Sequence, residues 1–328
     1  MKVSVLMPVY NAEQYLALAI DSIISQTFTD WELIIVNDGS TDKSEEIVLS
    51  YTDTRIRYIK NAENKGIIYT RNMMIEMALG TYIAFLDSDD ISEASRLEHQ
   101  VKFLDNNPEY ALCGTWGVII DDNGRQIGKI NMPSSDEEIR SSLLFVNTFI
   151  QSSIMIRREV LISHPYDKAY PVAEDYELWC RLSHLYKLKN IPIQLTQYRW
   201  HGNNISKSKK ELMVSLVKSI YKKELSCLGI NATEHQIRLH AAIKDKEVVN
   251  IPANLYFEEL RTWLKQIAQE GSKNKIYNKN VLRATIVFRW IFACKEWRMW
   301  KKYISFPIRL NMKEYRILLR MLSQRIIK

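Results

Sequence analysis

Short apolar runs alternate with amphipathic stretches over the first ninety residues. The runs are rich in β-branched residues and predict buried strands at 3–7, 31–36, 56–59 and 81–86. Apolar positions recur with helical spacing between them, which predicts helices over 12–25, from a cap at Ser40 or Thr41 to residue 51, and over 66–79. This alternation predicts an α/β fold built on a doubly wound, mostly parallel sheet.

Polar residues follow three of the predicted strands. They are the segments 8–11 (PVYN), 37–40 (NDGS) and 87–90 (DSDD). Ligands of open parallel sheets bind outside the carboxyl ends of the strands. We therefore expect a binding site where these three segments meet.

The pattern and the charge both change near residue 206. Helical spacing is present at 212–228 and 255–268, and residues 281–328 interleave aromatic with basic side chains. Residues 1–206 carry 19 Lys and Arg against 28 Asp and Glu, whereas residues 207–328 carry 26 against 10. This predicts two domains, 1–206 and 207–328, of which the second is helical and strongly basic.

The composition is that of a globular protein. Of 328 residues, 46% are hydrophobic and 25% charged, which excludes wholesale disorder. The four cysteines form no CxxC pair, which predicts a reduced chain in the cytoplasm. The first apolar run is short and interrupted by Pro8, as expected of a strand and not of a signal peptide. No run reaches the roughly 18 apolar residues of a spanning helix, so we expect a soluble or surface-bound protein.

The segment 87–90 concentrates acidic side chains. Asp87, Asp89 and Asp90 repel one another unless a cation or hydrogen-bond donors compensate them, and hard oxygen ligands suit Mg²⁺ or Mn²⁺. The alternative is that Asp90 or Ser92 caps the next helix while the other acids are solvated. The position directly after a buried strand favours the metal site.

Two further polar residues are candidates for a nucleotide. Asp38 has a carboxylate that can accept a hydrogen bond from a base N–H, although NDGS is also a common turn and cap. Arg71 is on a predicted helix near the same edge of the sheet. It can contact a phosphate or form a surface ion pair.

The segment 173–182 predicts a helix that begins with Glu174 and Asp175. Acidic side chains at this end are favoured by the helix dipole alone, so the pattern does not require a catalytic role. His201 follows Tyr198-Arg199-Trp200 and, taken alone, is as expected of an ordinary loop histidine.

The succession of these motifs resembles the family 2 glycosyltransferases of GT-A fold. The motifs are VSVLMPVYN at 3–11, QTF at 26–28, WELIIVNDGSTD at 31–42, NKG at 64–66 with RN at 71–72, and FLDSDD at 85–90. Asn37 departs from the family, which most often has Asp there. The resemblance implies inverting transfer of a sugar from a nucleotide donor, usually linked to UDP, with Mg²⁺ or Mn²⁺.

The resemblance also implies roles for the donor side. Pro8, Tyr10 and Asp38 would hold the uridine, and Arg71 would lie by the nucleotide or its phosphates. In the acidic motif Asp89 would bind the metal, Asp87 would contact the ribose, the metal or a metal-bound water, and Ser88 would contact the donor.

The acceptor side follows from the two later motifs. The resemblance implies that Asp175 is the catalytic base, with Glu174 helping to position it. His201, in the family's YRxH element, would contact the diphosphate or the metal. Family members with such tails build surface polysaccharides on lipid-diphosphate carriers, which implies a lipid-diphosphate-linked saccharide acceptor.

The basic tail predicts where the enzyme works. Its amphipathic, Trp-rich cationic stretches suit an anionic membrane surface, which predicts peripheral association with the inner face of the cytoplasmic membrane. The alternative is a helical support for the catalytic domain. Two other functions stay open, a module that binds a nucleotide sugar without transferring it and a nucleic-acid-binding protein, although we expect no nucleic acid partner.

Overall fold

A computed structural model describes residues 1–201, 209–273 and 275–324. The chain divides into two compact units, Met1–Ser134 with Phe149–Lys209 and Ser135–Thr148 with Lys210–Lys328. The second division lies close to the predicted boundary after residue 206. The segment 135–148 differs from the prediction, which kept it in the first domain. It belongs with the helical unit because its helix α5 (Asp136–Leu143) packs on α12 (Lys279–Glu296).

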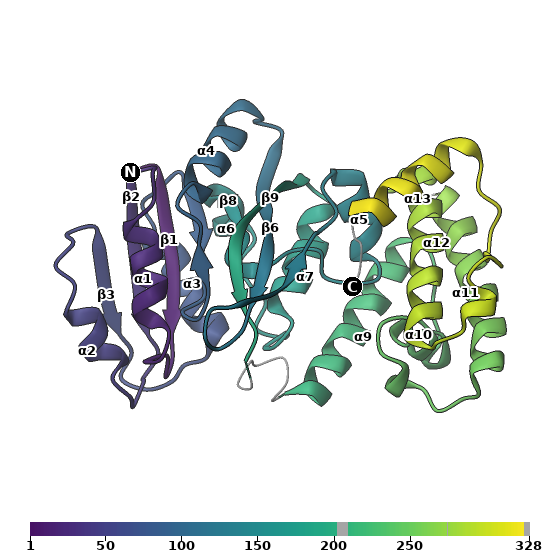
Figure 1. Ribbon diagram of the computed structural model, residues 1–328, viewed down its shortest axis with the longest axis horizontal. Coiled ribbons are helices and arrows are strands. Elements are labelled where there is room, and N and C mark those ends of the chain that lie inside the picture. The colour runs from purple at the N-terminus through teal and green to yellow at the C-terminus, as the bar shows by residue number, and fades with distance from the viewer. Residues whose placement is uncertain (202–208, 274, 325–328) are drawn as a thin grey trace. The chain divides into compact units, whose positions relative to one another are not determined.

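The first unit is built on one mixed sheet (Figure 1). Its parallel part has the order β3 (Ile56–Lys60), β2 (Trp31–Asn37), β1 (Val3–Val9) and β4 (Tyr82–Phe85). These strands are the four that the apolar runs predict, and the α/β fold class is confirmed.

Helices cover both faces of this parallel part. The helices are α1 (Leu16–Ile24), α2 (Ser44–Leu49), α3 (Ile67–Met77) and α4 (Arg96–Asn106). Every residue of β1 and β2 is buried. Successive side chains of a strand point to opposite faces, so a strand covered on both sides is apolar at nearly every position. The exceptions within the two runs, Ser4 and Glu32, are buried and hydrogen-bonded to each other at 2.6 Å. This explains why these runs do not alternate with polar residues.

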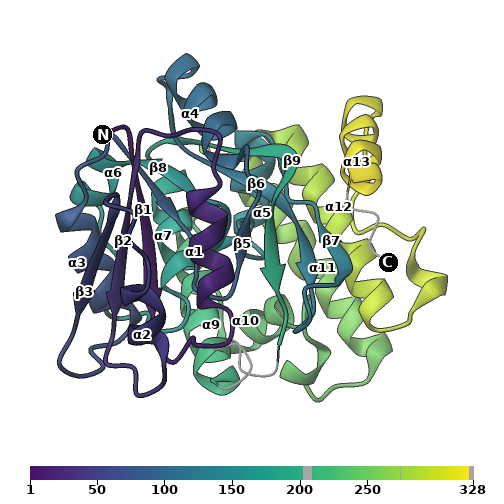
Figure 2. The ribbon, with the colours of Figure 1, turned by 60° about the vertical axis from the view of Figure 1, so that its left-hand side comes forward.

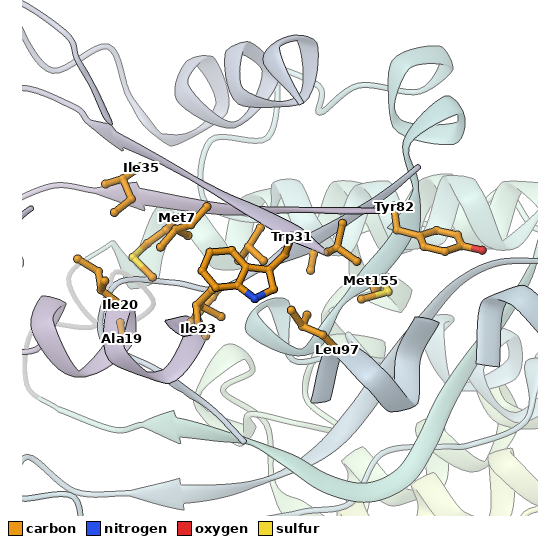
Figure 3. Close-up of a cluster of buried hydrophobic side chains, with 14 of the residues drawn as sticks. Met7, Ala19, Ile20, Ile23, Trp31, Ile35, Tyr82, Leu97 and Met155 are labelled. Atoms are coloured by element: carbon orange, nitrogen blue, oxygen red, sulfur yellow. The ribbon is translucent and has the colours of Figure 1, made fainter. Parts of the chain in front are cut away.

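One face of the sheet carries the main core of the unit. Met7, Trp31 and Ile35 from β1 and β2 pack with Ile20 and Ile23 of α1, which lies along the sheet (Figures 2 and 3). Burying a large apolar side chain of this kind contributes roughly 1.5–3 kcal/mol. This packing holds the first two strands in register and so fixes the loops at their carboxyl ends.

The predicted helix cap after β2 is wrong. Helix α2 begins at Ser44, and neither Ser40 nor Thr41 caps it. The Ser40 hydroxyl accepts a hydrogen bond from the backbone N–H of Asn11, and the Asn11 side chain accepts one from the Thr41 N–H. Both residues join the loops after β1 and β2 to each other.

Beyond β4 the sheet changes direction. Strand β8 (Met155–Arg157) runs antiparallel to β4 and to β6 (Tyr110–Ile120), and β6 pairs in parallel with β9 (Lys187–Arg199). The edge strands are β5 (Ile91–Ser92) on β9 and β7 (Gln126–Ile130) on β6. Strand β9 thereby ends beside the segment that follows β4. The remaining elements of this unit are η1 (Gln151–Ser153), α6 (Arg158–Ser163) and α7 (Glu174–Ser183).

The second unit is helical, as predicted. Besides α5 and α12 it contains α9 (Lys210–Cys227), α10 (Glu234–Ala241), η2 (Lys246–Val248), α11 (Ala253–Lys273), η3 (Trp300–Lys302) and α13 (Met312–Gln324). None of the helices in the described residues is both long enough and apolar enough to cross a bilayer.

The aromatic and basic stretch of the tail is divided between core and surface. Trp290 is fully buried and its Nε1 donates to the Lys302 carbonyl at 3.0 Å. The ring of Trp297 stacks on Tyr256 at 4.2 Å, and Arg289 is only 8% exposed. Trp290 and Arg289 are therefore not available to a membrane, and Trp297 is half-buried in its stack on Tyr256.

A buried histidine joins α5's segment to the rest of the helical unit. His240 Nε2 donates to the Leu144 carbonyl at 2.9 Å, and its Nδ1 accepts from Trp263 Nε1 at 3.2 Å. The ring also stacks on Phe145 at 4.8 Å. Both nitrogens are used by the neutral imidazole, and burial lowers the pKa of His240 from 6.5 to about 4.

We predict a loss of stability on mild acidification. The unfolded chain takes up this proton below the ordinary pKa of histidine and the folded chain does so only below about 4, so stability falls as pH falls through that window. Between pH 7.5 and 5.5 the free energy of unfolding should drop by about 1 kcal/mol, measured by urea denaturation. His240→Gln should be less stable at pH 7.5 but lack this part of the pH dependence. An unchanged dependence in that variant would contradict the assignment.

Candidate active site

The acidic segment after β4 contains carboxylates in different environments. Asp90 is 2% exposed and accepts hydrogen bonds from the Ser152 hydroxyl and, at 2.8 Å, from the Arg199 N–H. Burial, together with the charges of Asp89 and Asp87, raises the pKa of Asp90 well above its ordinary value. Asp90 is therefore a structural carboxyl that ties the end of β4 to η1 and β9.

Asp89 is half-exposed and faces the end of β9. Its Oδ2 lies 2.9 Å from His201 Nε2, and its carbonyl accepts from Arg199 Nε at 2.8 Å. The His201 ring stacks on Tyr15 at 5.6 Å, so a side chain from the start of α1 also lies here. The structure brings together Asp89 and His201, which the sequence predicts as metal or diphosphate contacts.

A buried arginine joins the acidic segment to α7. Arg71, on α3, is 5% exposed. Its Nη2 lies 3.0 Å from Asp87 Oδ1 and its Nη1 lies 2.5 Å from Glu174 Oε1. Burial opposes the charged form, but Asp87, Tyr166 and the two acids of α7 raise the pKa of Arg71 above its ordinary value. In the structure this guanidinium bridges two carboxylates. Its contact with phosphates stays a prediction.

The two acids at the start of α7 differ in burial, as do the acids after β4. The helix begins at Glu174, as predicted. Burial raises the pKa of Glu174 from 4.5 to about 7, with Arg71 opposing the shift and Asp175 adding to it. Asp175 is half-exposed, and its Oδ1 accepts from the Tyr176 N–H at 2.6 Å. Glu174 is thus a buried anchor and Asp175 is the carboxylate that solvent reaches.

Asp38 shapes a loop as well as facing the site. Its Oδ1 accepts from Asn61 Nδ2 at 2.7 Å and from the Lys65 N–H at 2.9 Å, and its Oδ2 accepts from the Gly66 N–H at 2.9 Å. A Cβ on Gly39, whose φ is +74°, would lie 2.7 Å from the Asn64 nitrogen. Only glycine allows the turn and the loop to approach this closely.

The remaining predicted donor contacts lie at the same edge of the sheet. Pro8 is buried within β1, and Tyr10, just after it, is 53% exposed. Ser88 is half-exposed between Asp87 and Asp89. The structure therefore gathers the ends of β1, β2 and β4, as the rule for parallel sheets predicts.

Sequence reasoning missed two residues of this network. Ser152, on η1, accepts from the Asp87 N–H at 3.1 Å and donates to Asp90. Arg199 lies two residues before the predicted His201, and its Nη1 donates to the Asp121 carbonyl at 2.8 Å. No local pattern identifies Ser152, but a basic residue in the YRxH element was a usable signal for Arg199.

The chemistry of the donor set fits a divalent cation that is completed by its substrate. Asp87, Asp89 and His201 do not form a closed group of three ligands among the residues the structure describes. Mg²⁺ usually binds one or two carboxylates together with substrate phosphates, and Asp89 and Asp87 offer that number. The residues present suit an ion that arrives with a nucleotide diphosphate.

Comparison with known proteins identifies the family. The model of Glycosyl transferase family 2 matches residues 4–164. The chain belongs to this family. It is 33% identical over 213 residues to the Escherichia coli UDP-Glc:alpha-D-GlcNAc-diphosphoundecaprenol beta-1,3-glucosyltransferase WfgD, covering 64% of this chain and 82% of WfgD. It is 32% identical over 255 residues to WfaP of the same description and organism, covering 74% of this chain and 98% of WfaP.

The fold of this chain is similar to that of solved structures. The Staphylococcus aureus TarS fragment 1–349, crystallised in complex with UDP-GlcNAc, superposes with a TM-score of 0.59. The sequence identity is 18%, and the match covers 93% of this chain and 91% of that one. The GT-A-type architecture is confirmed, and the chain is a glycosyltransferase and not a sugar-binding module.

We predict that the acids after β4 separate by their effect on stability. Asp90→Ala leaves the Ser152 hydroxyl and the Arg199 N–H without a buried acceptor, which should lower the free energy of unfolding by about 1–3 kcal/mol. Asp89→Ala removes a half-exposed carboxylate and should cost less than about 1 kcal/mol. Urea denaturation at pH 7 without nucleotide compares the two. Equal losses would contradict the structural role of Asp90.

Proposed function

We propose that this glycosyltransferase transfers a sugar from a UDP-sugar to a hydroxyl of a lipid-diphosphate-linked saccharide, with inversion, during the synthesis of a surface polysaccharide. The names of WfgD and WfaP describe a UDP-Glc donor, a diphosphoundecaprenol acceptor and a β-1,3 product. Because glucose is α-linked in UDP-Glc, a β-linked product implies inversion in those relatives. A carrier-lipid acceptor would bring the reaction to a membrane surface, and we propose the cytoplasmic face.

The observation that carries the proposal is the contrast between Asp175 and Glu174. Glu174 is held by Arg71, which also holds Asp87 of the acidic motif. Asp175, next in the chain, is left half-exposed. One ion-pair bridge thus connects the donor motif to the start of α7 and leaves a solvent-accessible carboxylate beside it.

This arrangement supports a single displacement. Asp175 takes the proton of the acceptor hydroxyl as the oxygen attacks the anomeric carbon, and the bond from that carbon to the UDP oxygen breaks. UDP leaves with the bonding electron pair. Because the base and the leaving group lie on opposite faces of the sugar, the anomeric configuration inverts.

Residues after β4 and β9 serve the leaving group. Asp89 and Asp87 would hold Mn²⁺ or Mg²⁺, with His201 beside Asp89. When bound with the donor, the ion stabilises the negative charge that develops on the diphosphate. The protein's own contribution is to fix both carboxylates, through the contacts of Arg71 with Asp87 and of Arg199 with the Asp89 carbonyl.

The uridine would lie over the ends of β1 and β2. Asp38 uses three hydrogen bonds to hold its loop, and an ionised carboxylate has about four acceptor positions. Capacity for a base N–H therefore remains. Tyr10 is exposed at the same edge, and Pro8 lies two residues before it within β1.

Asp89→Ala should abolish metal-dependent turnover. We expect UDP release from the matching UDP-sugar to fall roughly hundredfold or more, because the ion's charge stabilisation is lost. EDTA should silence the native enzyme and Mn²⁺ or Mg²⁺ should restore it. Full activity of the variant in EDTA would defeat the metal assignment. A screen of UDP-sugars with a synthetic α-GlcNAc-diphosphate lipid identifies the donor, and NMR of the product shows its anomeric configuration.

Asp175→Asn should separate chemistry from binding. The amide preserves size but accepts no proton, so transfer should fall about 10²-fold or more while the Kd for UDP changes little. Calorimetric titration with UDP and Mn²⁺ measures the second quantity. Glu174→Gln is the matched comparison, since it removes the charge of one of the two carboxylates that Arg71 binds and should also lower stability. Loss of UDP binding with normal transfer in Asp175→Asn would move this residue to the donor site.

A further inference from the structure

A basic groove lies within the helical unit. It is lined by α11, α12 and the segment 306–309, and its volume is about 680 Å³. Figure 1 shows α11 and α12 side by side, with the C-terminal segment in yellow returning along them. All of its lining residues belong to the helical unit, so the groove is formed without the catalytic unit.

The groove is lined by cations. Six basic residues and no carboxylate are among its described lining residues, and the basic ones are Arg261, Lys265, Lys273, Lys279, Arg283 and Arg309. Lys273 pairs with Glu270, and Arg283 pairs with Glu314. The described residues include no ion-pair partner for Lys265, Lys279 or Arg309, all three of which are exposed. An uncompensated positive field of this kind attracts anions.

One wall of the groove is held in place by Arg261. Its guanidinium donates to the Phe306 carbonyl at 2.9 Å, to the Ser305 carbonyl at 2.8 Å and to the Ser305 hydroxyl at 2.9 Å. None of these acceptors is charged, so Arg261 keeps its positive charge while fixing the wall. The wall itself is apolar at Phe306, Pro307 and Ile308. The groove therefore combines cations with an apolar surface.

The chain just before this wall exposes large apolar side chains. Ile304 is 89% exposed and Trp300 is 61% exposed, with its ring stacked on Tyr303 at 5.4 Å. Arg298 and Lys301, in the same turn, are also exposed. We call residues 300–304 the apolar tip. Side chains of this size are normally buried, and Trp beside basic residues is typical of the headgroup region of a bilayer.

We propose that the helical unit docks on an anionic phospholipid membrane, with lipid phosphates in the basic groove and the apolar tip in the headgroup layer. This goes beyond the transfer reaction and involves a different unit of the chain. The location differs from the one the sequence predicts, because Trp290 and Arg289 are buried and Trp297 is half-buried in its stack on Tyr256. The observations favour lipid over nucleic acid: RNA binding would use the cations and aromatic rings but gives no role to a fully exposed isoleucine.

The experiment is flotation of the full-length chain with phosphatidylcholine vesicles, with and without 30% phosphatidylglycerol. Binding is expected only with phosphatidylglycerol and should weaken as NaCl rises from 50 to 500 mM, because salt screens surface charges. Each basic residue near an anionic surface contributes about fivefold to binding. The variant Lys265→Gln, Lys279→Gln, Arg309→Gln should therefore lose at least tenfold.

The matched control removes three other cations of the same unit that do not line the groove. It is Lys218→Gln, Lys222→Gln, Lys246→Gln, which has the same net charge as the groove variant. It should bind within about threefold of the native chain. A second variant, Trp300→Ser with Ile304→Ser, keeps every charge and should lose the fraction that stays bound at 500 mM NaCl. Circular dichroism and thermal unfolding show whether each variant folds, and single Lys→Gln changes replace any that does not.

Three results would overturn the proposal. The first is no binding to phosphatidylglycerol vesicles. The second is an equal loss of vesicle binding in the groove and control variants, which would mean that net charge alone decides binding. The third is RNA displacing the vesicles through the same groove residues at physiological salt. None of these measurements uses a sugar donor or an acceptor, so their failure is distinguishable from failure of the transfer assignment.

Discussion

The site depends on placing several carboxylates at the end of one buried strand, where they repel one another and lose hydration. The fold compensates them with two buried arginines from distant parts of the chain. Arg71 binds Asp87 and Glu174, and Arg199 donates its backbone N–H to Asp90 and its side chain to the Asp89 carbonyl. Removing one partner of such a network leaves a buried charge without compensation, which is costly. The end of β4 is therefore held to α7 by ion pairs and to the end of β9 by hydrogen bonds.

This compensation divides the acids into two kinds. Asp90 and Glu174 are buried and bound by donors, so they hold the site together. Asp89 and Asp175 are half-exposed, and they are the carboxylates that a cation and an acceptor hydroxyl can reach. In each pair the buried acid is the chain neighbour of the one that we propose to act in the reaction. Neighbouring positions thus provide both rigidity and access, as preorganised catalysis requires.

The aromatic and basic residues of the helical unit are likewise divided between buried and exposed positions. Trp290 is buried and Trp297 is half-buried, and both donate their ring N–H groups to backbone carbonyls, whereas Trp300 and Ile304 are exposed. Arg261 uses its donors to hold a wall next to them. The sequence pattern alone treats all of these side chains as equivalent, because burial depends on how α11, α12 and the C-terminal segment pack.

The sequence by itself determined the parallel part of the sheet, its strand-end loops and the start of α7. These features follow from local patterns, since a strand covered on both faces is mostly apolar and the ligand-binding loop at its end is polar. It did not reveal which acid in DSDD or in the Glu174–Asp175 pair is buried. That depends on Ser152, Arg199 and Arg71, which lie 62, 109 and 103 residues from their acidic partners in the chain. Such pairs leave no periodic signal, so only the tertiary structure decided which carboxylates are buried and which stay half-exposed.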